Sequence, residues 1–216
     1  ALKLYNKDAE FRFRRFIELN PEDPRDDLAY YLLAKNNFER KKYGKSLEWI
    51  NQIDIKGLPK ENLPDYYYYK GYSLFKEDLY SDALLSFSKN LIEGDPYYYP
   101  ALYYTAYINY TNEHYQLALE RFQILANEEG FSELVPYYVS QIYFLQERYL
   151  ELIEYAEPWM ENVSTKRKGE MSRLLAEAYY YEGNYEKSLL YYEVYYSSPS
   201  QLNRDDYYAY GYCLYK

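Results

Sequence analysis

The residues that could do chemistry are few in this chain. His114 is its one histidine and Cys213 its one cysteine. A catalytic base or a metal ligand needs partners at a recognisable spacing, and neither residue has any in the sequence. We therefore interpret His114 as a surface or helix-capping residue and Cys213 as a small packing residue. With a single cysteine, the chain forms no internal disulfide.

Three carboxylates, Glu151, Glu154 and Glu157, follow one another at intervals that place them on one face of a helix. Paired carboxylates act as general acid and base only in a cleft that shifts their pKa values, and nothing in the sequence predicts one here. A solvated helix face is the simpler interpretation. The chain also has no glycine-rich phosphate loop. The sequence thus predicts no enzyme activity, no metal site and no cofactor.

The charge of the chain restricts its partners. Thirty-four acidic residues against 25 basic ones give a net charge of −9, so a nucleic-acid partner would be held against net repulsion. The one basic run, at residues 166–168, is expected to be a solvated approach to a helix. No apolar stretch approaches the ~18 residues that a membrane span needs. We therefore expect neither a nucleic-acid partner nor a membrane span in this segment.

A repeat organises the whole chain. Tyr43, Tyr80, Tyr115, Tyr149 and Tyr185, here called the corner tyrosines, follow one another in steps of about 34 to 37 residues. Each has a small residue nine positions earlier and a small or aliphatic one three positions later. The earlier residues are Ala34, Gly71, Ala106, Ser140 and Ala176, and the later ones are Ser46, Ala83, Ala118, Leu152 and Ser188. Small residues on both sides predict two helices in close contact, with the tyrosine ring filling the corner between them.

Apolar periodicity and stop signals support these helices. Leu84, Phe87 and Leu91 share one helical face. Glycine or proline residues, which end helices, lie between the repeats, as at Gly94 and Pro96. No stretch alternates as a strand would. The tyrosine runs at 66–69 and 97–99 have β propensity, but they lead into helical faces, so we assign them to the first turns of helices. The predicted fold class is all-α.

The repeat resembles the tetratricopeptide repeat (TPR), whose 34-residue unit pairs a first helix containing a small residue with a second helix of the form Ala-x3-Phe. Ala83 and Phe87 have that spacing, and so do Ala118 and Phe122. The resemblance implies a right-handed superhelical solenoid of antiparallel helix pairs with about 12 helices. We expect one solenoid over residues 1–216, truncated at both ends. It comprises a half repeat at 5–20, whole repeats at 26–60, 64–97, 99–131, 133–165 and 169–200, and a half repeat at 204–216.

The resemblance also implies a binding surface, because the first helices of TPR arrays line a concave face. Positions three before, one after and four after the small residue tend to face that groove. Rings occupy most of them, and we name as partner-binding candidates Tyr68, Tyr72, Phe75, Tyr103, Tyr107, Tyr110, Tyr137 and Gln141. These eight are called the groove residues. Tyr72 and Tyr107 stand where peptide-clamping members of the family carry Asn, so a clamp for acidic tails is not expected.

Several functions remain open at this stage. Tyrosine makes up 36 of 216 residues, which AT-rich codon usage explains as well as a recognition surface does. The first hypothesis is a non-catalytic scaffold that binds a protein or peptide in the concave groove. The alternatives are a glycan-binding platform that uses the same rings, and a regulatory solenoid of a larger multidomain protein. A softer similarity to long TPR proteins of Gram-negative bacterial envelopes favours the periplasm or cell envelope.

Overall fold

The computed structural model describes residues 7–20, 23–161, 163, 165–198 and 204–216. The described residues form helices and turns without any strand, which confirms the all-α prediction. Residues 5–6 of the predicted first half repeat, residues 162 and 164 of the predicted fourth repeat and residues 199–200 of the predicted fifth repeat lie outside the described residues. The α-helices are α1 (Lys7–Leu19), α2 (Asp26–Glu39), α3 (Tyr43–Ile50), α4 (Leu63–Lys76), α5 (Tyr80–Phe87), α6 (Tyr98–Thr111), α7 (Tyr115–Leu125), α8 (Val135–Leu145), α9 (Tyr149–Ala156), α10 (Thr165–Tyr181), α11 (Tyr185–Tyr196) and α12 (Arg204–Tyr215).

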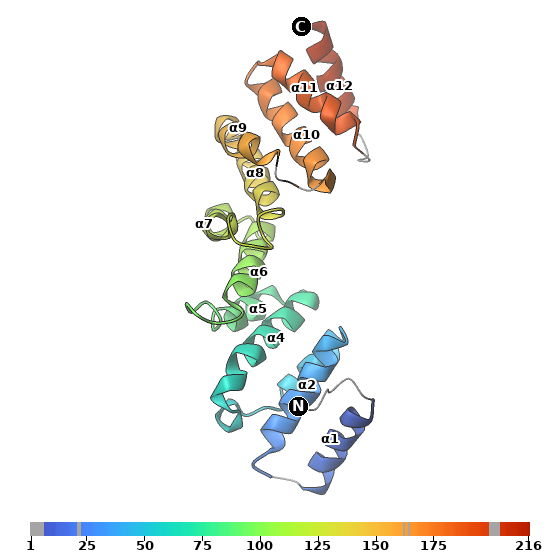
Figure 1. Cartoon of the computed structure of the whole chain (residues 1–216), viewed down its shortest axis with the longest axis vertical. Coiled ribbons are helices and arrows are strands. Elements are labelled where there is room, and N and C mark those ends of the chain that lie inside the picture. Colours follow the sequence, from blue (N-terminus) through green and yellow to red (C-terminus); the bar gives the residue numbers. More distant parts are fainter. Residues whose placement is uncertain (1–6, 21–22, 162, 164, 199–203) are drawn as a thin grey trace. The chain divides into compact units, whose positions relative to one another are not determined.

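The chain forms two compact units, Ala1–Ile108 and Asn109–Lys216, here called unit 1 and unit 2. Consecutive helices pack together within each unit, as with α2 and α3 in unit 1. In unit 2, α10 and α11 lie side by side (Figure 1). Short 3₁₀ turns at Ile55–Gly57, Lys60–Asn62 and Glu157–Trp159 complete the connections. Within the described residues, no helix combines the length and apolarity that crossing a bilayer requires.

Every corner tyrosine is the first residue of a second helix: α3, α5, α7, α9 and α11 all begin there. The turn before it has one backbone conformation in all five copies. The residue two positions before the tyrosine adopts a positive φ, which only glycine tolerates without strain. These residues are Lys41, Asp78, Glu113, Glu147 and Gly183, with φ between 56° and 76°. Glycine stands at this position in one copy alone.

The small residues bring the two helices of a pair into contact. In the first repeat the Ser46 hydroxyl donates to the Ala34 carbonyl at 2.9 Å, and in the fifth the Ser188 hydroxyl donates to the Ala176 carbonyl at 2.7 Å. In the second repeat, a Cβ built on Gly71 would lie 2.8 Å from the Phe87 ring. Small residues 12 positions apart therefore face each other in the first and fifth repeats, and in the second repeat Gly71 lets the Phe87 ring approach the first helix.

Bulky residues seven positions after the corner tyrosine form the centre of each unit. Ile50 and Phe87 are buried in unit 1, and Phe122 and Tyr192 in unit 2. Ala156 stands at this position in the fourth repeat and is fully buried as well. Cys213 is buried against Tyr192 and Tyr195, as expected of a small packing residue. The core of the protein is thus a series of similar layers rather than one centre.

Candidate functional site

Each repeat carries an aromatic ring four positions after the small residue, and this ring packs on the corner tyrosine. Two of the groove residues, Phe75 and Tyr110, stand at this position. All five repeats show the contact, at centroid distances of 5.8 to 6.3 Å. The pairs are Phe38 with Tyr43, Phe75 with Tyr80, Tyr110 with Tyr115, Phe144 with Tyr149 and Tyr180 with Tyr185. Phe75 and Tyr110 therefore help to close the turn between the paired helices, whatever else they contact.

Tyr68 and Tyr72 of α4 lie in a dense aromatic cluster of unit 1. The Tyr68 ring stacks on Tyr97 at 4.3 Å and 12°, and burial raises the pKa of its hydroxyl. The Tyr72 ring meets Phe38 and Tyr43 edge-on, each at 5.4 Å, and it also contacts Tyr68. One face of Tyr68 is thus covered, and Tyr72 joins the first repeat to the second.

Tyr103 and Tyr107 lie one helical turn apart on α6, in the part of that helix that belongs to unit 1. Their rings are 6.4 Å apart with an interplanar angle of 28°. The Tyr107 ring also meets Phe75 edge-on at 5.8 Å. Both side chains are partly buried, so part of each ring faces solvent. The structure brings Phe75, Tyr103 and Tyr107 together on one face of α4 and α6.

In unit 2, Tyr110 meets Tyr138 edge-on at 5.5 Å. Tyr137 of α8 lies beneath the Arg167 guanidinium, whose carbon is 4.4 Å from the ring centroid. Burial raises the pKa of the Tyr137 hydroxyl. Gln141 is partly buried, and its carbonyl oxygen accepts no hydrogen bond in the described structure. Arg167 is also paired with Glu170 at 2.5 Å, so an ion pair lies beside the Tyr137 ring.

A second ring position, two residues before the small residue, was not predicted from the sequence. Tyr104 stacks on Phe87 at 5.7 Å and 13°, and Tyr138 stacks on Phe122 at 5.3 Å and 5°. Each ring joins a first helix to the second helix of the preceding repeat. The available signal was the recurrence of Tyr104 and Tyr138 at equivalent positions, 34 residues apart.

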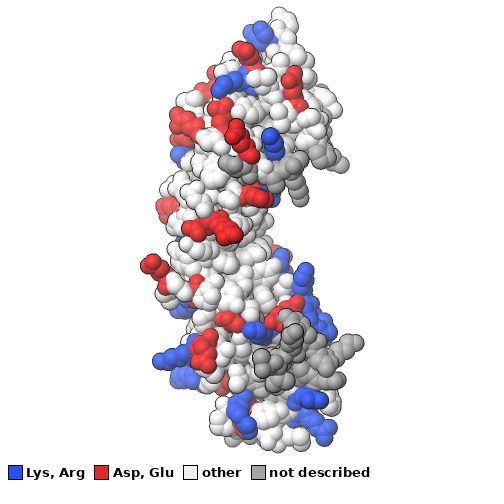
Figure 2. Space-filling view, viewed as in Figure 1, with Lys and Arg blue, Asp and Glu red and all other residues white. Residues whose placement is uncertain are grey.

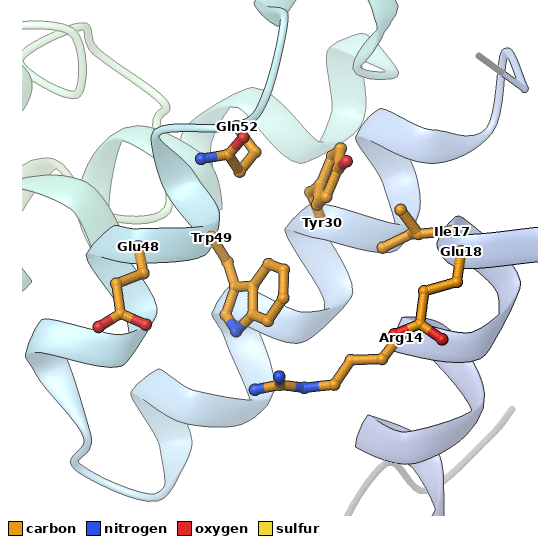
Figure 3. A pocket seen from close by; sticks show the side chains of 7 residues that line it. All are labelled: Arg14, Ile17, Glu18, Tyr30, Glu48, Trp49 and Gln52. Atoms are coloured by element: carbon orange, nitrogen blue, oxygen red, sulfur yellow. The ribbon is translucent and has the colours of Figure 1, made fainter. Parts of the chain in front are cut away.

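A recess of about 340 Å³ lies among α1, α2 and α3. Figure 3 shows Arg14 of α1 extending toward Trp49 of α3, and its guanidinium carbon is 4.8 Å from the indole centroid. Tyr30 of α2 stacks on the same indole at 6.1 Å. Arg14 also pairs with Glu10 at 3.0 Å. These residues lie off the predicted groove positions, and they bring neither a nucleophile nor a metal-ligand set together.

A larger recess of about 560 Å³ lies in unit 2, between α10 and α12. Arg173, Glu177, Tyr180 and Tyr208 line it, and each stands at a position that the TPR resemblance assigns to the groove. Arg173 and Glu177 form an ion pair. Burial raises the pKa of Glu177, and the charges of Asp206 and Asp205 raise it further, although Arg173 lowers it. The recess therefore holds one carboxyl, that of Glu177, whose ionised form is disfavoured by burial and by neighbouring negative charges.

His114 precedes α7, and its φ and ψ of −80° and 60° match those of the residues before the other second helices. The Cys213 thiol lies 3.3 Å from the Ser188 hydroxyl. Across the described part of the chain, no group of three His, Cys, Asp or Glu side chains is placed to hold a metal ion. Figure 2 shows acidic and basic side chains interspersed on the visible face, with uncharged areas between them.

No known sequence family matches the chain, and no curated protein is similar enough in sequence to count as a relative. Solved structures do match. MamA AMB-1 superposes with a TM-score of 0.70 at 14% identity, over 85% of this chain and 97% of that one. A point mutant of MamA gives 0.61 at 15% identity, over 78% and 95% of the two chains. YrrB, described as a TPR protein with an unusual peptide-binding site, gives 0.67 at 16%, over 94% and 98%. This chain has the fold of the tetratricopeptide repeat proteins.

Proposed function

We propose that the protein is a non-catalytic scaffold that binds a peptide segment of another protein along the first-helix face. The observation that carries the proposal is the row of partly buried rings at equivalent positions of successive first helices, above all Tyr103 and Tyr107 on α6. Tyrosine suits such a surface because it offers a large contact area, few rotatable bonds and a hydroxyl that forms directed hydrogen bonds. YrrB, with a similar fold, carries a peptide-binding site, which supports the same class of partner here.

The ring geometry supports a peptide more than a sugar. A sugar ring stacks on exposed, coplanar aromatic faces, whereas an extended peptide also packs against ring edges. One face of Tyr68 is covered by Tyr97, and Tyr72 meets Phe38, Tyr43 and Tyr104 at steep angles of 60° to 87°. Tyr103 and Tyr107 come nearest to a shared plane, with 28° between them. A glycan would therefore find a short platform on α6, while a peptide can follow α4 and α6 together.

The test removes the two neighbouring rings of α6, Tyr103 and Tyr107. The double variant Tyr103→Ala with Tyr107→Ala should lose the partner that the wild type captures from native extract, as measured by quantitative mass spectrometry. The control variant Leu85→Ala removes a side chain that is 68% exposed on α5, a second helix, and should capture the partner normally. Thermal unfolding of both variants should stay close to that of the wild type.

Equal capture by the wild type and the double variant would overturn the proposal. So would a partner lost through Leu85→Ala but retained by the double variant, because binding would then use the second helices. A glycan array provides the comparison with the alternative. If the protein binds defined sugars and Tyr107→Ala abolishes that binding, the ligand of this face is a glycan and not a peptide.

A further inference from the structure

The place in unit 1 that is equivalent to the acidic recess of unit 2 is occupied by a lysine side chain. There the Lys35 ammonium of α2 bonds the Asp65 carboxylate of α4 at 3.1 Å, and the Tyr31 hydroxyl donates to the same oxygen at 2.9 Å. The ammonium also lies 6.0 Å from the Tyr31 ring and 5.8 Å from the Tyr69 ring. A lysine side chain between two neighbouring first helices is thus held by one carboxylate and two aromatic rings.

The repeat register gives the equivalent residues in unit 2, because Ala34 corresponds to Ala176 and Gly71 to Gly211. Asp65 corresponds to Asp205, so the carboxylate is retained. Lys35 corresponds to Glu177, so the ammonium is replaced by a second carboxylate. The place that a cation fills in unit 1 therefore carries the opposite charge in unit 2.

Two further differences open the recess and add polar groups. Tyr69 of unit 1 corresponds to Ala209, which removes a ring from the space between the first helices. Ile50 corresponds to Tyr192, which lines the recess, is fully buried and has a hydroxyl without a hydrogen-bond partner. A buried hydroxyl without a partner is destabilising, and a ligand with a polar group in the recess can bond it.

The charges around this hydroxyl indicate the kind of ligand. Among the described side chains that line the recess are three carboxylates, those of Glu177, Asp205 and Asp206, and the guanidinium of Arg173. Asp206 is buried and accepts a hydrogen bond from the Tyr195 hydroxyl at 3.2 Å. Burial, followed by the charges of Glu177 and Asp206, raises the pKa of the Tyr192 hydroxyl, so it stays protonated and its oxygen can accept a hydrogen bond. A cationic N–H donor satisfies both the oxygen and the carboxylates.

We propose that this recess binds a lysine side chain of the peptide partner, with the ammonium between Glu177 and Asp205 and within reach of the Tyr192 hydroxyl. This proposal rests on the proposed function, because the lysine is one side chain of the peptide that the scaffold binds. The rings of Tyr180 and Tyr208, which also line the recess, pack against the lysine alkyl chain. Unit 1 satisfies the same arrangement internally through Lys35, whereas unit 2 takes its lysine from outside.

The test uses a probe that contains one lysine and no partner protein. Nα-acetyl-lysine N-methylamide is titrated into the isotope-labelled full chain, and amide resonances of α10 and α12 are followed by NMR. We expect saturable shifts with a millimolar dissociation constant that rises with salt, because the contact is electrostatic. The norleucine analogue, which keeps the alkyl chain and lacks the ammonium, should give none.

Two variants test the residues of the recess, and a third serves as the control for the change of charge. Glu177→Lys recreates the Lys35 arrangement beside Asp205, so its own ammonium should occupy the recess and weaken probe binding by about tenfold or more. Glu193→Lys makes the same charge change at an exposed position of α11 and should bind the probe nearly as the wild type does. Tyr192→Phe removes only the hydroxyl and should weaken binding by about three- to tenfold without unfolding the protein.

Absence of shifts in α10 and α12, or equal shifts with the norleucine analogue, would overturn the lysine site. Equal weakening by Glu193→Lys and Glu177→Lys would also overturn it, because net charge alone would then explain the effect. The titration involves no partner, so its failure leaves the capture experiment on Tyr103 and Tyr107 unaffected. Conversely, capture that ignores those tyrosines would contradict the groove proposal even if the lysine probe binds.

Discussion

Gly71 illustrates how a single residue sets the distance between two helices. A methyl group there would lie 2.8 Å from the Phe87 ring, which is fully buried and cannot move away freely. Gly71→Ala should therefore destabilise the protein by about 1–3 kcal/mol, measured by urea unfolding. Gly211→Ala is the matched control, because nothing lies within 4 Å of a Cβ there. It should be neutral or stabilising by up to about 1 kcal/mol, since alanine favours the helix. Equal effects of the two substitutions would contradict the close approach.

Glu177 supports a prediction with a defined pH dependence. Burial and the charges of Asp206 and Asp205 raise its pKa in the folded protein above the ordinary value of 4.5, despite Arg173. The ionised carboxylate thus costs stability at pH values above the folded pKa, and that cost disappears below 4.5, where it is protonated in both states. Glu177→Gln should therefore unfold at a higher temperature than the wild type at pH 7, and the difference should shrink as the pH falls.

Glu157→Gln is the control of opposite sign. Burial would raise the pKa of Glu157, but hydrogen bonds from Tyr179, Lys187 and Tyr191 outweigh it and lower the pKa. The ionised form therefore contributes stability above the ordinary pKa, and this contribution is lost as the pH falls through the lowered value. The variant should unfold earlier than the wild type at pH 7, with the gap closing in acid. If Glu177→Gln also unfolds earlier than the wild type at pH 7, the ionised Glu177 carboxylate does not destabilise the folded protein.

At the scale of the element, the turn between paired helices is the most regular feature. Its positive φ falls on Glu113 in the third repeat and on Gly183 in the fifth. Glu113→Gly should stabilise the protein by about 1 kcal/mol, because glycine relieves the left-handed strain of a residue with a Cβ. Gly183→Ala should destabilise it by a similar amount, although nothing lies within 4 Å of the added methyl. Thermal unfolding of the two variants measures both, and shifts of the same sign would contradict the account.

The helix pairs could be predicted from the sequence because their signals are local and repeated. The corner tyrosine fixes the first residue of each second helix, and the small residues fix which faces meet. The ring stacks of Tyr104 and Tyr138 could not be predicted in the same way. Where a tyrosine ring points depends on the neighbouring repeat, and most positions of α4 and α6 carry a tyrosine or another apolar residue, so residue type does not distinguish them.

At the scale of the molecule, repetition allows one part of the chain to explain another. The sequence placed Lys35 and Glu177 at equivalent positions, but only the structure shows that Lys35 bonds Asp65 and that Glu177 faces a recess. The sequence also did not predict that the Tyr192 hydroxyl lacks a hydrogen-bond partner, because in the repeat pattern its position simply calls for a bulky core residue. Departures from the repeat pattern therefore deserve more weight as site predictions than the pattern itself.

The central claim is that a partner binds along the first helices, and site-specific photo-crosslinking tests it most directly. A photoreactive phenylalanine analogue replaces Tyr107 on α6 in one protein and Leu85 or Leu190 on the second helices in two others, where the leucines are 68% and 57% exposed. After irradiation in native extract, mass spectrometry identifies the linked peptide. We predict a crosslink to one partner peptide from position 107 and none to it from positions 85 and 190. A crosslink to the same peptide from the second helices, with none from position 107, would contradict the claim.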